Sequence, residues 1–122
     1  MQWTLDKSRP ICPQICELIC VAIASGEFSG GEKLLSVREI ALLSGVNPNT
    51  VQKSFEELER RGVIHSVRCS GWYVNENSDA AVDEVKSLRL KKTEEYLAAM
   101  ARLGCNADEI IQYLHECQGG NT

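Results

Sequence analysis

The sequence lacks any long apolar run, and no basic-then-apolar leader stands at its N-terminus. A helix that crosses a membrane needs about 20 mostly apolar residues, and a secretory signal needs a basic start before its apolar segment. We therefore expect a cytoplasmic protein with no membrane partner. At 122 residues the chain can bury one modest core with an appendage, and it has no room for a separate ligand-binding domain of usual size.

Residues that build catalytic or metal centres are also scarce. The chain has two histidines, His65 and His115, and no C-x-x-C pair. Its spacing shows no nucleophile beside a base, no glycine loop for phosphates and no set of metal ligands. We predict that the protein is not an enzyme and that it has no catalytic residues, no metal site and no cofactor.

Positive charge is in short supply as well, since 13 Lys and Arg face 17 Asp and Glu, for a net charge of −4. That balance argues against non-specific polyanion binding as the main activity, but DNA binding depends on the local field rather than on the sum. Residues 1–76 carry eight bases against nine acids, and residues 77–122 carry five against eight. Arg38, Lys53 and Arg68 can still share one basic face.

Six cysteines are present, and in a cytosolic chain we expect them to be reduced. Cys12, Cys16 and Cys20 recur every four residues, which places three thiols on one side of a predicted helix. Such a row could bind a soft metal or sense an oxidant, or it could supply small apolar side chains that widen a buried face. We favour the second reading, and a thiol- or metal-responsive regulator is the alternative.

Residues 36–61 carry the signals of two helices joined by a tight corner. Ser36 and Glu39 form a capping box that starts the first helix, and Gly45 ends it. The apolar positions expected in this helix are Val37, Ile40, Ala41 and Leu43.

The second helix of the pair begins with Asn47 as N-cap and Pro48 at the first helical position. Its apolar positions are Val51, Phe55 and Leu58. Two short helices with a glycine corner predict a helix-turn-helix. The polar first turn of the second helix suits phosphates and base edges.

The run SVREIALLSGVNPNTVQKSFEELERRGVI, followed by SGWYV, resembles the GntR family of bacterial transcription regulators. The opening WTLDKSRPICPQI and the short C-terminal part resemble its small YtrA-like branch, and the likeness covers residues 3–75 well. The resemblance implies a mainly α (α+β) fold. A winged helix-turn-helix domain with a two-stranded wing would occupy residues 1–76, and a two-helix dimerisation segment would occupy residues 77–122.

The resemblance also implies which residues approach double-stranded DNA. They are Arg38, Pro48, Asn49, Thr50 and Gln52 in the helix-turn-helix, with Arg68 and Gly71 at the wing tip. Asn and Gln can pair with adenine, whereas Lys53 and Arg68 suit phosphates and thus affinity rather than sequence choice. Asn47 is counted in the interface but suits a cap better than a reader. The plainer alternative makes Arg38 a solvated surface residue, and it makes an ordinary hydrophilic face of Asn49, Thr50, Gln52 and Lys53.

Two further segments frame this motif. Trp3 and Leu5 alternate as a short strand would, and a helix with an apolar stripe follows. VIHSV and GWYV predict the strands of the wing, with either Trp72 or Tyr73 facing the core. The family's wing loop usually reads Gly-x-Gly, and Cys69 replaces its first glycine. Because a Cβ resists positive φ by roughly 1–2 kcal/mol, we expect a differently shaped or flatter loop.

The C-terminal part predicts two antiparallel helices, the second started by a capping box of Asn106 and Glu109. Their apolar side is too small to close a core, and the nearest partner is another copy of the chain. We expect a homodimer on a palindromic operator with half-sites about 10 bp apart. Likeness to the YtrA-like branch implies a repressor, and no effector can be deduced. The acidic net charge supports one further alternative, a winged module that binds a protein. The apolar positions of the two predicted C-terminal helices are Val82, Val85, Leu88, Tyr96, Leu97, Met100, Leu103, Ile110, Ile111, Tyr113 and Leu114.

Overall fold

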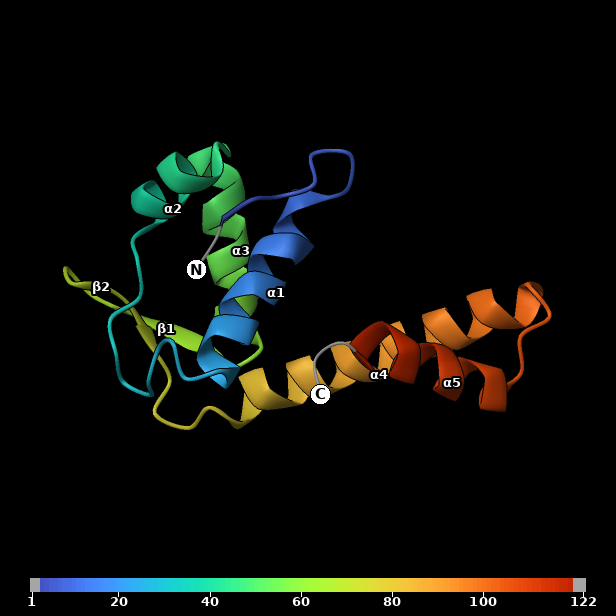
Figure 1. The fold of residues 1–122 in the computed structure, drawn as a ribbon. Helices are drawn as coiled ribbons and strands as arrows, with labels where there is room; N and C mark the ends of the chain where they lie inside the picture. The colour runs from blue at the N-terminus through green and yellow to red at the C-terminus, as the bar shows by residue number, and fades with distance from the viewer. Residues whose placement is uncertain (1–2, 120–122) are drawn as a thin grey trace. The chain divides into compact units, whose positions relative to one another are not determined.

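The computed structural model describes residues 3–119. These residues form five helices and one two-stranded antiparallel sheet, which confirms the predicted winged helix-turn-helix fold with C-terminal helices (Figure 1). Along the chain, two compact units are separated by a boundary between residues 86 and 87. No helix in the described span is both long and apolar enough to cross a membrane. In chain order the elements are α1 (Ile11–Ala24), α2 (Val37–Ser44), α3 (Pro48–Arg60), β1 (Ile64–Val67), β2 (Gly71–Val74), α4 (Asp79–Arg102) and α5 (Ala107–Gln118).

The core of the first unit lies where α1 and α3 pack side by side (Figure 1). Ile15 and Ile19 on α1 are completely buried, and so are Val51, Phe55 and Leu58 on α3. The spacing of the three α3 residues puts them on one side of the helix, as predicted. Burying each such side chain contributes roughly 1.5–3 kcal/mol, so this core fixes α3 with its polar side outward.

The segment before α1 is not a strand, contrary to the expectation from Trp3 and Leu5. Trp3 is buried, and Leu5 packs half-buried against the core. The backbone N–H and C=O of Asp6 both bond to the side-chain amide of Gln14, at 2.8 and 2.9 Å. A strand needs a neighbouring backbone to satisfy its polar groups, and here a side chain of α1 does so instead.

α2 starts and ends as predicted. The Ser36 hydroxyl accepts from the Glu39 N–H, and the Glu39 carboxylate accepts from the Ser36 N–H. Gly45 ends the helix with a φ of 68°, in the region that favours glycine. Lys7, in the segment before α1, donates to the carbonyls of Ser44 and Gly45. These bonds tie that segment to the corner of the helix-turn-helix.

The prediction that Leu43 belongs to the apolar face of α2 is wrong, since 60% of this residue is exposed. Positions separated by three, four and seven residues share one side of a helix. On α2 that side consists of Val37, Ile40, Ala41 and Ser44. The Ser44 hydroxyl tolerates burial because it donates to the Ile40 carbonyl at 2.6 Å.

β1 and β2 form the predicted hairpin, with Ile64 opposite Val74 and Val67 opposite Gly71. The outer edge of β2 is also occupied, which the sequence did not indicate. Lys33 forms an isolated bridge with Tyr73. The neighbouring Leu34 N–H donates to the Trp72 carbonyl at 2.8 Å. The loop before α2 therefore lies along the wing as a short third backbone segment.

Trp72 is the wing residue that joins the core. Its ring meets Phe55 edge to face, with 5.3 Å between ring centroids. Tyr73 instead stacks on His65, with centroids 6.2 Å apart, and its hydroxyl forms a hydrogen bond with Ser70 of the loop. The question left open by the sequence is thus settled: Trp72 anchors the hairpin, and Tyr73 covers its other side.

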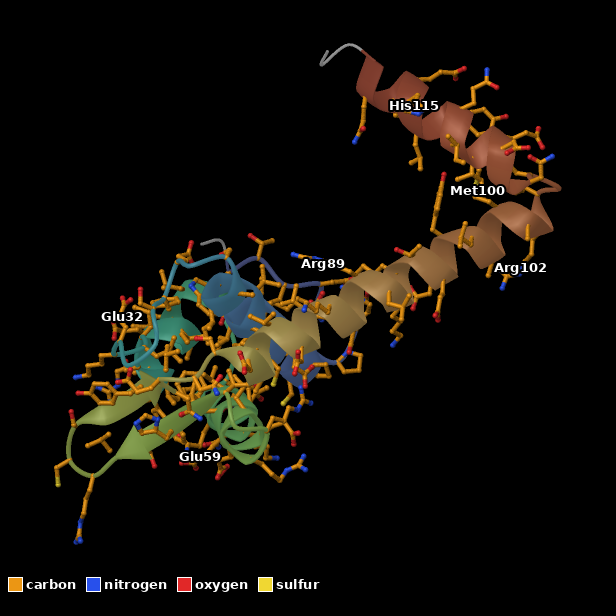
Figure 2. All side chains as sticks on the ribbon, turned by 90° about the horizontal axis from the view of Figure 1, so that it is seen from below. Glu32, Glu59, Arg89, Met100, Arg102 and His115 are labelled. Atoms are coloured by element: carbon orange, nitrogen blue, oxygen red, sulfur yellow. The ribbon has the colours of Figure 1, made fainter. Side chains whose placement is uncertain are left out.

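In the second unit, α5 folds back antiparallel to α4, and Met100 lies between the two helices (Figures 1 and 2). Asn106 and Glu109 form the predicted capping box of α5. Among residues 87–119 only Ile110 is buried. Large apolar side chains of this unit remain exposed, namely Leu90, Tyr96, Leu97, Leu103, Ile111, Tyr113 and Leu114.

Candidate nucleic-acid interface

The first turn of α3 is polar and points away from the core. The side chain of Asn47 accepts from the Asn49 N–H at 2.8 Å, so Asn47 acts as the N-cap. Pro48 takes the first helical position, Asn49 and Gln52 are exposed, and Thr50 is half-buried. The exposed amide side chains of this turn can therefore reach a partner without disturbing the fold.

Three basic residues predicted for the interface are exposed. Arg38 lies in the first turn of α2, Lys53 lies on the outer side of α3, and Arg68 lies in the loop of the hairpin. Within residues 3–119, none of the three forms an ion pair. Exposed cations without an internal partner can neutralise phosphates, which is the main source of affinity for DNA.

Two arginines at the C-terminal end of α3, Arg60 and the C-cap residue Arg61, are engaged within the protein. The Glu57 carboxylate accepts hydrogen bonds from both Arg60 and Arg61, and these bonds hold its pKa below the usual range. Arg61 also reaches Glu84 of α4 at 3.5 Å. The end of α3 that lies far from its polar tip is thus tied to the start of α4, within the first unit.

The wing loop is held in a conformation that its sequence resists. Cys69 has a φ of 64°, although it carries a Cβ. It therefore adopts the positive φ that a Cβ was expected to resist. That conformation costs a residue with a Cβ roughly 1–2 kcal/mol. Gly71 has a φ of 136°, and a Cβ added there would lie 3.1 Å from Cε of Lys33. The positive φ of Gly71 therefore favours glycine at this position, and the nearby Arg68 of the loop is exposed.

A carboxylate of α3 holds the wing, and sequence reasoning missed it. Glu59 accepts from both the backbone N–H and the hydroxyl of Ser66 on β1, each at 3.2 Å. Figure 2 shows Glu59 beside the hairpin. In the sequence, Glu59 is one of several charges in EELERR, and no local signal marks the acid that faces a strand seven residues later.

The base of the wing is braced by two side chains. The Nδ1 atom of His65 and the Oδ1 atom of Asn75 are 2.6 Å apart, and the Asn75 amide donates to the Gly62 carbonyl at 2.7 Å. His65 is half-buried. These bonds connect β1, the residue after β2 and the turn after α3, and so tie the base of the wing to the body. His65 thus has a structural role at the base of the wing.

The cysteine row of α1 lies largely inside the core. Cys16 and Cys20 are buried, and Cys12 is half-buried. Burial is the chief cause that raises the pKa of Cys16 to about 12 and that of Cys20 to about 11. The Cys16 thiol also donates to the Ser54 carbonyl, with 3.6 Å between the heavy atoms. No group of three or more His, Cys, Asp or Glu side chains within residues 3–119 could hold a metal. These facts favour the reading of the row as small apolar side chains.

Comparison with known proteins gives consistent matches. The family model for bacterial regulatory proteins of the gntR family matches residues 13–74. The HTH-type transcriptional repressor YtrA of Bacillus subtilis is 34% identical over 110 residues, which cover 89% of this chain and 85% of YtrA. A GntR family transcriptional regulator from Listeria monocytogenes superposes with a TM-score of 0.82 and 36% identity, over 92% of this chain and 98% of that one. AraR(DBD) in complex with operator ORE1 superposes with a TM-score of 0.52 and 27% identity, over 54% of this chain and 80% of that one.

Proposed function

This chain belongs to the gntR family of bacterial regulatory proteins, and we propose that it is a repressor that binds a palindromic operator as a homodimer. As a member of that family it is a DNA-binding transcriptional regulator of the GntR type, and it is not an enzyme. Because its target is the DNA of a bacterial cell, we place it in the cytoplasm.

The observation that carries the proposal concerns α3. Its first turn is polar and exposed, while its apolar side, formed by Val51, Phe55 and Leu58, is completely buried. A recognition helix enters the major groove with its N-terminal residues. We assign Asn49, Thr50 and Gln52 to base edges, because amide side chains can make paired hydrogen bonds to adenine. Pro48 and Asn47 shape the turn and bring its backbone close to the DNA.

Phosphate contacts form the second part of the proposal. Arg38, Lys53 and Arg68 are exposed and form no ion pair among residues 3–119. Contacts of this kind fix the position and orientation of a protein on the duplex. Gly71 has no side chain of its own to hold the wing backbone away from the DNA. The AraR(DBD) structure, which contains operator DNA, supports such a placement of the same fold.

The homodimer is inferred from the second unit. We assign residues 1–76 to DNA binding, and residues 77–122 to dimerisation through the part of this segment that lies in the second unit. The start of α4 packs into the core of the first unit through Ala81 and Val85. Tyr96, Leu97, Ile111 and Leu114 are between 38% and 53% exposed. We infer that they contribute to one apolar surface, and a large surface of this kind marks an interaction site. A two-fold dimer presents two α3 tips, which calls for an inverted repeat. The direction of regulation, repression, is carried over from YtrA.

The test begins with full-length protein and a pool of random duplexes. The selected sequences should be inverted repeats, and the protein should bind them at least about a thousandfold more tightly than a scrambled duplex at physiological salt. A reporter gene placed behind the selected operator should fall in expression when the protein is produced. Equal affinity for selected and scrambled duplexes would refute the DNA-reading proposal, single half-sites would refute the dimer, and a rise in reporter expression would refute repression.

A further inference from the structure

Lys33 lies along the outer edge of β2 in a position that the sequence did not reveal. Its backbone pairs with Tyr73 in an isolated bridge. Its side chain then crosses the start of β2, since a Cβ built on Gly71 would lie 3.1 Å from Cε and 3.8 Å from Nζ of Lys33. The ammonium group is therefore held beside the backbone of Gly71, next to the wing loop.

The surroundings of this ammonium group place it between two parts of the proposed interface. Hydrogen bonds from Ser36 are the chief cause that lowers the pKa of Glu39, and the nearby charge of Lys33 adds to them. Glu39 belongs to the first turn of α2, next to Arg38. Lys33 thus lies between the α2 start and Gly71. It is exposed, and within residues 3–119 its side chain forms no ion pair.

We propose that Lys33 is a further DNA-binding residue, which contacts a backbone phosphate between the contacts of Arg38 and those of the wing. This inference rests on the proposed function. An ammonium group on a flexible stem suits a phosphate as a point charge, and a phosphate contact adds affinity without sequence choice. Because Gly71 has no side chain, the aliphatic stem of Lys33 can pass over its Cα and bring the ammonium group to this position.

The test compares full-length wild type with K33M, K33R and a control, K91M. K33M keeps an unbranched stem over Gly71 and removes the charge, and K33R keeps the charge. Lys91 is exposed on α4 in the second unit, so K91M makes the same change of net charge outside the unit that contains the wing. Dissociation constants are measured for the selected operator and for a scrambled duplex between 50 and 200 mM salt, with thermal melts to confirm the fold.

K33M should bind both duplexes more weakly by the same factor. Each phosphate contact contributes about 0.9 to the slope of log K against log salt, so wild type should lose about threefold more affinity than K33M between 50 and 200 mM salt. K33R and K91M should keep the wild-type slope. A second uncharged variant, K33Q, should match K33M.

Different failures have different meanings. If wild type prefers no duplex, the proposed function falls and this inference falls with it. If wild type binds its operator and the K33M slope equals that of wild type, only the Lys33 contact is refuted. A weaker K33M with an unchanged slope also refutes it, because Lys33 would then act through packing on Gly71. The same change in K91M would show a general effect of charge and would refute the contact as well.

Discussion

Asn47 and Asn49 are the same residue type two positions apart, yet the structure gives them different tasks. The Asn47 side chain is occupied by the Asn49 N–H at 2.8 Å, whereas the Asn49 side chain is exposed. Replacing an N-cap with Ala costs about 1 kcal/mol of stability. Losing a paired contact to a base costs about 1–3 kcal/mol of discrimination.

We therefore predict that N47A lowers the free energy of unfolding by about 1 kcal/mol, and that N49A leaves it unchanged within about 0.5 kcal/mol. N49A should instead reduce the preference for operator over scrambled duplex. Urea unfolding and titration of both duplexes measure the two quantities. A stable N49A protein with full operator preference would contradict the role given to Asn49.

The reactivity of the thiols should depend on their burial. Because their pKa is raised to about 12 and about 11, Cys16 and Cys20 hold almost no thiolate at neutral pH, and the thiolate is the reactive form. We predict that iodoacetamide at pH 8 modifies the exposed Cys69 and Cys117 in the folded protein, and reaches Cys16 and Cys20 only after unfolding. Mass spectrometry of peptides reads this directly. Rapid modification of Cys16 in the native protein would revive the thiol-sensor alternative.

The same shifts give stability a pH dependence. A thiol whose pKa is higher in the folded than in the unfolded state keeps its proton after the unfolded chain has lost it. The unfolded chain then binds fewer protons, so stability falls as pH rises. The contribution of Cys16 and Cys20 is complete below the ordinary pKa of 9.0 and is lost as pH rises toward about 11 and 12.

At the scale of elements, the hydrogen bonds from Ser66 of the wing to Glu59 of α3 should outweigh the effect that the charge of Glu59 alone would have on DNA affinity. Removing an acid from a DNA-binding domain should raise its affinity if charge alone mattered. Glu59, however, holds Ser66 of β1 through two hydrogen bonds, and Ser66 lies two residues before Arg68. Losing the ionised acceptor should loosen the wing.

We predict that E59Q weakens operator binding, whereas E56Q, which alters an exposed acid of the same helix, leaves binding unchanged or tightens it. In an R68A background the effect of E59Q should shrink, because the loosened wing no longer carries its cation. Titration of the four proteins gives the coupling between the two sites. Equal effects of E59Q in both backgrounds would mean that Glu59 does not act through Arg68.

The elements that the sequence predicted well are those with local causes. The capping boxes at Ser36 and Asn106, the N-cap at Asn47 and the glycine at position 45 each act within one turn of chain, and all of them are present. The pairing of Lys33 with Tyr73 could not be predicted, because its partners are forty residues apart and the segment has no alternating pattern. The places of Glu59 and Lys33 beside the wing depend on that same long-range packing.

At the scale of the whole molecule, the proposed function depends on two copies acting together. One winged unit meets one half-site, and tethering a second unit converts its binding into an intramolecular step that can raise avidity by about 10²–10⁴. Among the described residues, the second unit carries exposed large apolar side chains, to which we assign the contact between copies. The start of α4 has a different task, because Ala81 and Val85 lie in the core of the first unit.

Two truncations separate these tasks. A protein that ends at Lys86 keeps Ala81 and Val85 and should melt cooperatively, yet it should be a monomer by sedimentation equilibrium and bind the operator about 10²–10⁴ times more weakly. A protein that ends at Glu76 loses both core side chains and should be less stable, since burying Val alone contributes roughly 1.5–3 kcal/mol. The full-length variant L97E/I111E provides the control: it should be monomeric with an unchanged winged unit. If the protein that ends at Lys86 is still a dimer with full operator affinity, the contacts between copies lie in the winged unit and not in the C-terminal helices.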